Sequence, residues 1–357
     1  MPETVTIIGD GAMATVCSLL LTQGGHAVTI WGAFEESINR LLQNRENQRL
    51  LPGVKLPPNV FLTGNDSECF RNCTLIVSAV PTQYMRAVWQ RLERHVPRGV
   101  PIVSVAKGIE NHTLLRPTQI IADCLGKRPL AALSGPNIAA ELAKYLPATA
   151  VAASDDSALA ERIQSTFSTQ WFRVYTNSDL SGTELAGATK NVIAIAAGIL
   201  DGLAAGNNAK AALVTRGLVE ITRLGVAMGA QESTFHGLAG LGDLITTCVS
   251  PEGRNRTVGE QIGKGKKLED ILESMDSVAE GVPTTKSLFE LSQRHNVEMP
   301  ITEATHAVLF EGRDVIHALT DLMTRQSKPE KELAGSVSNP SAKKPAEGPV
   351  MMRYHGD

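Results

Sequence analysis

The apolar and polar positions at the start of the chain alternate between short apolar runs and helical stretches. An apolar strand at Thr4 to Gly9 is followed by a helical pattern at Ala12 to Gln23, with its aliphatic residues on one face. Gly24 ends that helix, and a second apolar run begins at Ala27 to Trp31. Such a β-α-β unit, of about 30 residues, has the length that a parallel crossover needs.

The same alternation continues over roughly the first 180 residues. Further apolar runs end just before polar or glycine-rich residues, at Leu75 to Val80, Pro101 to Ala106, Ala131 to Leu133 and Ala148 to Ala153. Strands that alternate with helices predict an α/β domain with a doubly wound sheet over residues 1–183. Ligands of such a sheet bind at the carboxyl ends of its strands.

The pattern becomes purely helical after Asp179. Helical periodicity extends over Leu185 to Leu200, Ala209 to Ala230, Glu260 to Glu273, Thr284 to Arg294 and Thr302 to Phe310. We therefore predict an all-helical second domain over residues 184–326. Residues 327–357 are rich in proline, serine and lysine and have few large aliphatics, which predicts a disordered tail.

Composition narrows the class of protein. The chain has 357 residues, of which 43% are hydrophobic and only 4% aromatic, so its core must be mainly aliphatic, which favours α/β or α structure. A net charge of −3 without a strongly basic window argues against nucleic acid as a partner. The five cysteines are scattered and predicted to be reduced, with no metal site. No run of about 18 apolar residues and no signal peptide is present, so we predict a cytoplasmic protein without a membrane span.

A glycine motif follows the first strand. Gly9, Gly11 and Ala14 fit G-x-G-x-x-A, in which the first glycine allows a tight turn and the second lets a pyrophosphate approach the backbone. A tight strand-to-helix turn without a ligand is the alternative. The acidic residue expected after the second strand is missing, since that strand runs into Gly32 and Ala33, and no arginine stands there to meet a 2′-phosphate. The choice between NAD and NADP stays open.

Two lysines are candidates for chemistry. Lys190 is the only charged residue between Leu185 and Leu200, and burial would lower its pKa and suit it to exchange a proton with a reacting oxygen. The alternative is a lysine that reaches water from one edge of the helix. Lys107 follows a strand at the edge where a substrate would lie, although a surface lysine in a loop is equally common.

Three polar segments could line the same site. Ser134 to Asn137 lies between a strand and a helix and could donate hydrogen bonds to a ligand, or could simply cap the helix. Gly237 to Asp243 is glycine-rich but is not a P-loop, and Asp243 could orient a lysine or cap a helix. Arg254 to Arg256, predicted to lie in a loop, could clamp a substrate phosphate or form a solvated turn.

Taken together, these segments resemble the NAD(P)-dependent glycerol-3-phosphate dehydrogenases of the bacterial type. The resemblance covers about residues 4 to 313 and rests on an ordered set of stretches: Gly9 to Ala14, Val105 to Glu110, Ser134 to Asn137 with Ala139 and Glu141, Glu184 to Gly198, Asn208 to Leu213, Gly237 to Leu244, Arg254 to Arg256 and Ala279 to Val282. It implies a Rossmann domain followed by a helical domain.

The resemblance also implies an activity and a set of site residues. Dihydroxyacetone phosphate would be reduced to sn-glycerol 3-phosphate for phospholipid synthesis, with Lys190 as the proton donor or acceptor. A homodimer is the expected assembly. The implied substrate residues are Lys107, Gly135, Asn137, Lys190, Asp243, Gly253, Arg254 and Asn255. The implied cofactor residues are Gly9, Gly11, Ala12, Met13, Ala33, Lys107, Ala139, Arg254, Val278 and Glu280.

Three departures from the family pattern bear on this implication. Ala33 stands where a basic or imidazole side chain is usual, Gly253 replaces a serine, and Asn137 replaces serine or threonine. Two other functions compete with this one. A 3-hydroxyacid dehydrogenase of the β-hydroxyacid type shares the two-domain plan and its lysine but would not need Arg254 and Asn255. A dinucleotide sensor without turnover would not need Lys107, Lys190 and Asp243.

Overall fold

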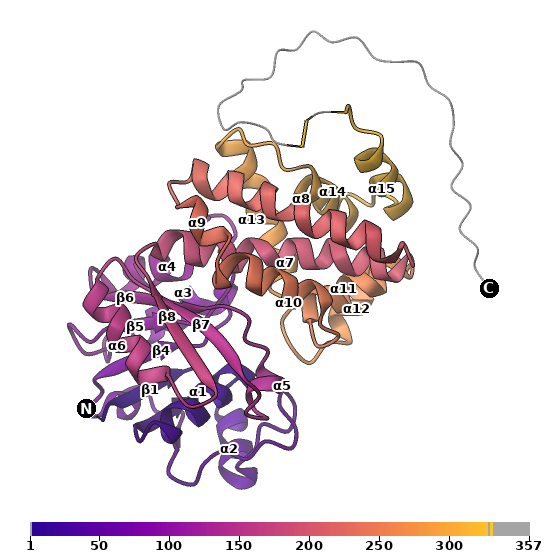
Figure 1. Cartoon of the computed structure of the whole chain (residues 1–357). Coiled ribbons are helices and arrows are strands. Elements are labelled where there is room, and N and C mark those ends of the chain that lie inside the picture. The colour runs from indigo at the N-terminus through magenta and orange to yellow at the C-terminus, as the bar shows by residue number, and fades with distance from the viewer. Residues whose placement is uncertain (1, 328, 331–357) are drawn as a thin grey trace.

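One eight-stranded sheet organises the N-terminal part of the chain in the computed structural model, which describes residues 2–327 and 329–330 (Figure 1). The strand order is β3-β2-β1-β4-β5-β6-β7-β8, parallel throughout except for the antiparallel pair β6 and β7. The strands are β1 (Thr4–Ile8), β2 (Ala27–Trp31), β3 (Phe61–Thr63), β4 (Leu75–Ser78), β5 (Ile102–Ser104), β6 (Leu130–Ser134), β7 (Ala148–Ala153) and β8 (Phe172–Asn177). The prediction of a doubly wound sheet is confirmed.

Helices cover both faces of this sheet. They are α1 (Ala12–Gln23), α2 (Glu35–Asn44), α3 (Thr82–Leu92), α4 (Pro117–Leu125), α5 (Ala139–Leu142) and α6 (Ser157–Phe167), with the short 3-10 turn η1 (Glu68–Phe70). One apolar core joins the strands to α1 and α6, and a second, on the other face, joins them to α3 and α4. Burial of alternate strand residues on both faces explains why these strands read as continuous apolar runs.

Two strands were missed by the sequence analysis. Strand β3 has only three residues, too few for a recognisable apolar run. In β8, buried Phe172 and Val174 alternate with exposed Arg173 and Tyr175, a pattern typical of an edge strand with one solvated face. The antiparallel pairing of β6 with β7 was also not anticipated.

The rest of the described chain is helical, as predicted. The helices are α7 (Leu180–Gly202), α8 (Gly206–Ala227), α9 (Glu232–Phe235), the π-helical turn η2 (Leu238–Gly242), α10 (Asp243–Val249), α11 (Arg254–Gly263), α12 (Leu268–Glu273), α13 (Gly281–Arg294), α14 (Pro300–Phe310) and α15 (Val315–Met323). Figure 1 shows α7 passing through the centre of this domain, with the other helices around it.

Glycines set how closely α7 and α11 approach each other. A Cβ at Gly198 of α7 would collide with the Arg256 carbonyl group, and one at Gly259 of α11 would collide with the Ile195 carbonyl group. Only glycine, which has no Cβ, allows the two backbones to touch where the helices cross. The small residues that the sequence places along α7 therefore serve close helix packing.

Two details of the helical prediction are wrong. The single helix expected over Glu260 to Glu273 is two, because α11 ends at Gly263 and Gly265 adopts a positive φ of 86° before α12 begins. Arg254 to Arg256 does not lie in a loop but forms the first turn of α11, behind the N-cap residue Gly253. Helix propensity is weak there, and the packing of α11 on α7 supplies the stability that the local sequence lacks.

The two predicted boundaries of the helical domain lie at residues 183/184 and 326/327. The proposed division between residues 183 and 184 falls in the first turns of α7, and it stays a prediction. The predicted tail at 327–357 lies almost wholly outside the described residues. All five cysteines are free, as expected. Within residues 2–327 and 329–330, no helix is long and apolar enough to cross a membrane.

Candidate functional site

The glycine turn between β1 and α1 has room for a phosphate. Gly9 has a φ of 113°, and a Cβ there would lie 2.7 Å from the Ala79 carbonyl oxygen, so a larger residue does not fit. Gly11 is the N-cap residue of α1, and the position of its missing Cβ has no described atom within 4 Å. Among the described residues, no side chain caps this end of α1. Open backbone N–H groups at a helix start fit a dinucleotide pyrophosphate.

At the other side of the site, one carboxylate holds two lysines. Asp243, the first residue of α10, accepts a hydrogen bond from Lys190 Nζ on Oδ1 at 2.5 Å and one from Lys107 Nζ on Oδ2 at 2.7 Å. Asp243 and Lys190 are almost fully buried, and Lys107 is partly buried. Residues 107, 190 and 243 are distant in sequence, so the fold brings together three separately predicted positions.

Lys107 also binds the segment after β6. Its Nζ donates to the Gly135 carbonyl oxygen at 2.9 Å and to Asn137 Oδ1 at 2.6 Å. Because Oδ1 of Asn137 is engaged, its Nδ2 is the atom that can donate to a ligand, and Nδ2 is a buried donor without a partner in the described part of the chain. Gly135, with a φ of 132°, lies against the backbone of Ala150.

Burial, together with the nearby charge of Lys107, lowers the pKa of Lys190 to about 8, although Asp243 opposes the shift. A lysine whose pKa lies close to physiological pH is present in both its ammonium and its amine form, so it can both donate and accept a proton. The apolar neighbours of Lys190 in α7 predict this lowering of the pKa from the sequence alone.

Two further residues contact the lysines, and the sequence pointed to Asn191, beside Lys190, but not to Thr247. Thr247 Oγ1 accepts a hydrogen bond from Lys190 and donates to the Asp243 carbonyl oxygen at 2.7 Å. Thr247 follows Asp243 by four residues in α10, so helical spacing could have indicated it. Asn191 donates through Nδ2 to the Lys107 carbonyl oxygen at 2.9 Å and fixes the lysine backbone.

The start of α11 presents the predicted arginine and asparagine. Asn255 Oδ1 accepts from Gly281 N at 2.9 Å, which leaves its Nδ2 as the donor. Arg254 donates to the Val278 carbonyl oxygen at 3.0 Å. A Cβ at Gly253 would lie 2.9 Å from the Thr247 carbonyl oxygen, so glycine makes this turn tighter than serine would. These contacts bring α11 and the segment before α13 together beside the lysine pair.

Arg256 has a different role from its two neighbours. Its guanidinium binds Asp201 Oδ2 at 2.7 Å and the Ser250 carbonyl oxygen at 3.0 Å. Lys210 pairs with the same Asp201 carboxylate. Arg256 therefore secures the turn that precedes Arg254, and the Asp201 cluster behind it was not found from the sequence.

The remaining predicted cofactor positions border the glycine turn or connect the domains. Ala12 and Met13 form the first turn of α1, and Ala139 begins α5. Ala33 follows β2, and its carbonyl oxygen accepts from Arg91 at 2.9 Å. Glu280 accepts from Thr82 N at 2.7 Å, which ties the start of α13 to α3, and burial raises the pKa of Glu280.

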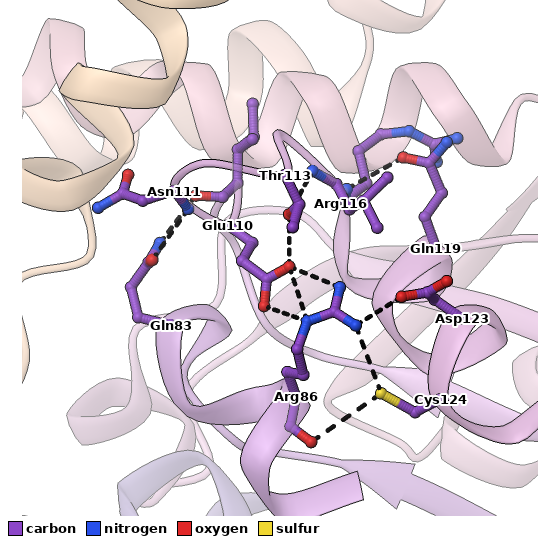
Figure 2. Close-up of polar contacts among 11 residues, drawn as sticks. Gln83, Arg86, Glu110, Asn111, Thr113, Arg116, Gln119, Asp123 and Cys124 are labelled. Carbon is purple, nitrogen blue, oxygen red and sulfur yellow. Dashed lines mark hydrogen bonds and ion pairs between the residues drawn. The ribbon is translucent and has the colours of Figure 1, made fainter. Parts of the chain in front are cut away.

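A second ionic cluster holds the segment that follows Lys107 (Figure 2). Arg86 of α3 grips the Glu110 carboxylate through Nε at 3.0 Å and NH2 at 2.8 Å, and its NH1 binds Asp123 of α4 at 2.5 Å. Gln83 donates to the Ile109 carbonyl oxygen at 2.8 Å and accepts from Asn111 N at 3.1 Å. Helix α3 therefore fixes the loop at residues 109–111, directly after Lys107.

Comparisons with known proteins agree over almost the whole chain. The family model described as NAD-dependent glycerol-3-phosphate dehydrogenase N-terminus matches residues 4–160, and that of the C-terminus matches 179–320. A relative from Citrifermentans bemidjiense, named glycerol-3-phosphate dehydrogenase (NAD(P)+), is 47% identical over 92% of this chain and 99% of its own length. One from Salinibacter ruber is 45% identical over 96% of this chain and all of its own.

Solved structures give the same result. Glycerol-3-phosphate dehydrogenase from Coxiella burnetii superposes with a TM-score of 0.88 and 34% identity, over 91% of this chain and 99% of that one. A D-mandelate dehydrogenase, at 11% identity over 86% of this chain and 97% of that one, has a TM-score of 0.59 and shares the fold alone. The two-domain fold therefore occurs in enzymes with different activities, so the function has to be inferred from the residues of the site.

Proposed function

The chain belongs to the NAD-dependent glycerol-3-phosphate dehydrogenase family, and from this membership we propose that it reduces dihydroxyacetone phosphate to sn-glycerol 3-phosphate with NADH or NADPH, reversibly. The observation that carries the proposal is the pair Lys107 and Lys190 on one buried carboxylate, Asp243, in a structure whose glycine turn fits a dinucleotide. The product would supply the backbone of glycerophospholipids.

Lys190 would carry the proton in this reaction. The cofactor, when bound, supplies the hydride that adds to the carbonyl carbon of the substrate. Negative charge then grows on the carbonyl oxygen, and the Lys190 ammonium stabilises that charge and gives the oxygen its proton. In the reverse direction the neutral amine of Lys190 takes the proton from the hydroxyl group. A pKa of about 8 leaves both forms accessible.

The other residues would position the reactants. Asp243 and Thr247 hold Lys190 Nζ in place from two sides, so the ammonium does not need to reorganise as charge develops. Lys107 and the Asn137 amide would hold the oxygens of the substrate. Arg254 and the Asn255 amide would bind the phosphate, whose binding energy would place the carbonyl group beside Lys190.

The direct test is to follow oxidation of NADH and NADPH by the purified protein with dihydroxyacetone phosphate. We expect turnover with the native protein and a loss of about 10³-fold or more in kcat for Lys190→Ala, which should still bind cofactor. Lys266→Ala, which removes an exposed lysine, is the matched control and should keep full activity. Cofactor binding without turnover of this ketone by the native protein would contradict the proposal and favour a sensor.

The phosphate clamp separates this function from that of a 3-hydroxyacid dehydrogenase. Arg254→Ala should raise KM for dihydroxyacetone phosphate by about 10-fold or more, since a bidentate contact to a dianion is lost. The same variant should leave the slow reduction of unphosphorylated dihydroxyacetone unchanged. Turnover of a 3-hydroxyacid in preference to the phosphate ester would support the competing function.

We also propose a cytoplasmic enzyme that forms a homodimer. Support for the compartment comes from the five free cysteines, four of which are buried. The candidate surface for self-association includes exposed apolar side chains on α8 and α15, Val219, Val226 and Ile316 among them. Light scattering on the full chain measures the oligomeric state, and a mass of one chain at micromolar concentration would contradict the dimer.

A further inference from the structure

The carboxyl ends of β1, β2 and β3 converge on Asp10, the residue between the two glycines of the turn. Gly9 N donates to the Trp31 carbonyl oxygen at 2.8 Å, and Gly32 N donates to the Thr63 carbonyl oxygen at 3.2 Å. A Cβ at Gly32 would lie 2.9 Å from Asp10 Oδ2. The Asp10 carboxylate therefore abuts the end of β2, where dinucleotide-binding folds usually carry the acid that holds the adenosine ribose.

This carboxylate has an unsatisfied oxygen. Asp10 Oδ2 is buried and has no hydrogen-bond partner among residues 2–327 and 329–330. The backbone at Asp10 is fixed, because Asn47 Nδ2 donates to its carbonyl oxygen at 2.8 Å. A buried acceptor without a donor costs free energy, and a hydroxyl group from a ligand would remove that cost. The carboxylate thus compensates for the acid that the end of β2 lacks.

The residues that directly follow β2 include no cation for a 2′-phosphate. After β2 come Ala33 and Phe34, and then Glu35 and Glu36 in the first turn of α2. An NADP site at this point needs a guanidinium or another cation to meet the extra phosphate.

The arginine that contacts the segment after β2 is already engaged. Arg91 binds Asp66 through Nε at 2.9 Å and NH2 at 2.8 Å, and the Ala33 carbonyl oxygen through NH1 at 2.9 Å. Its guanidinium also lies 5.0 Å from the centroid of the Trp31 ring. All three nitrogens of Arg91 are committed to the protein, so a 2′-phosphate would meet an acidic environment.

We propose that the Asp10 carboxylate accepts a hydrogen bond from the 2′-hydroxyl of the adenosine ribose, and that the enzyme therefore selects NADH over NADPH. This inference rests on the proposed function, since it needs a dinucleotide at the glycine turn. The 2′-hydroxyl satisfies the buried oxygen, whereas a 2′-phosphate brings about two negative charges to the same place. Like charges in contact disfavour the wrong ligand strongly, so we expect a preference of about 10-fold or more.

Calorimetric titration with ADP-ribose and with its 2′-phosphate tests the inference without any turnover. The native protein should bind ADP-ribose at least about 10-fold more tightly than the 2′-phosphate. Asp10→Asn should narrow that ratio by about 10-fold, mainly by improving binding of the 2′-phosphate. Phe34→Arg, at a residue that is 74% exposed and so free of packing constraints, should narrow it too by adding a cation. Asp270→Asn, an exposed acid on α12, is the charge-matched control.

The outcomes are distinguishable. Equal binding of the two ligands by the native protein, or a ratio that Asp10→Asn leaves unchanged in a variant with native melting temperature, would overturn the inference alone. If Asp10→Asn melts early, the ratio for Phe34→Arg decides. Binding of neither ligand would contradict the proposed function, and the inference with it.

Discussion

Two ionic clusters of this protein have opposite proportions of charge. In the cluster of α3 and α4, one guanidinium, Arg86, lies between two carboxylates, Glu110 and Asp123. In the candidate site, one carboxylate of the helical domain, Asp243, lies between two ammonium groups, Lys107 of the sheet domain and Lys190 of α7. The first arrangement raises the pKa of Arg86, chiefly through hydrogen bonds to Glu110, whereas burial lowers the pKa of Lys190 to about 8.

The difference separates a structural cluster from a reactive one. Because two carboxylates face one guanidinium in the first cluster, Arg86 stays charged and links α3 to α4 (Figure 2). With cation in excess and water excluded, the second cluster holds a proton weakly and attracts an anion. An anionic substrate would supply the second negative charge that is needed to balance Lys107 and Lys190, since Asp243 supplies only one.

The largest expected effect comes from removing the shared carboxylate. Asp243→Asn leaves the buried Lys190 and the partly buried Lys107 without their shared counter-charge, so Lys190 should lose its proton more easily and its orientation as well. We expect a fall in kcat/KM for reduction of about 10² to 10³-fold, measured at pH 7. If the variant keeps native kcat/KM, the Asp243 cluster is structural, like the Arg86 cluster, and has no part in catalysis.

The pH dependence of the rate should follow Lys190. Reduction needs the ammonium form, so kcat/KM should fall about tenfold per pH unit above about 8, while oxidation of glycerol 3-phosphate should rise and level off there. The pKa in the fold lies below the unfolded value, so the unfolded chain binds more protons from pH 8 upward. Stability attributable to this group therefore increases with pH between about 8 and 10.5. Profiles of both directions and chemical denaturation at several pH values measure these slopes.

Breaking the structural cluster should have a smaller effect on catalysis than on stability. Glu110→Gln leaves Arg86 without its main partner and should cost about 1–3 kcal/mol of unfolding free energy, because the pair is mostly but not fully buried. Lys107 is three residues away, so kcat/KM should fall less than about 10-fold. Asp123→Asn, at the more exposed partner, should cost about 1 kcal/mol or less. Equal losses from the two variants would show that burial does not set the strength of the cluster.

The sequence predicted the parts of the site that depend on local order. The turn at Gly9 and Gly11 was recognisable because strand, turn and helix follow one another within the β-α-β unit. Lys190 was recognisable because a single charge stands in an apolar helix. The pairing of Lys190 with Asp243 was not derivable, since 53 residues and three helices separate them and only tertiary packing sets the contact.

What the sequence missed has physical reasons as well. The sequence predicts a loop at Arg254, because Ser250, Pro251 and Gly253 are loop residues, whereas the helical start depends on contact with α7. The Asp201 cluster links α7, α8 and α11, so no single segment displays it. Glu280 gave no local signal for its hydrogen bond to Thr82, 198 residues away in the chain.

The glycine contact between α7 and α11 has a further consequence for selectivity. Lys190 stands on α7 and Arg254 on α11, and the backbones of these helices touch at Gly198 and Gly259. The contact therefore fixes the separation of the backbones that carry the proposed proton donor and the proposed phosphate ligand. We expect the enzyme to discriminate against phosphate esters one carbon longer or shorter, because the two helices cannot slide apart to follow the substrate.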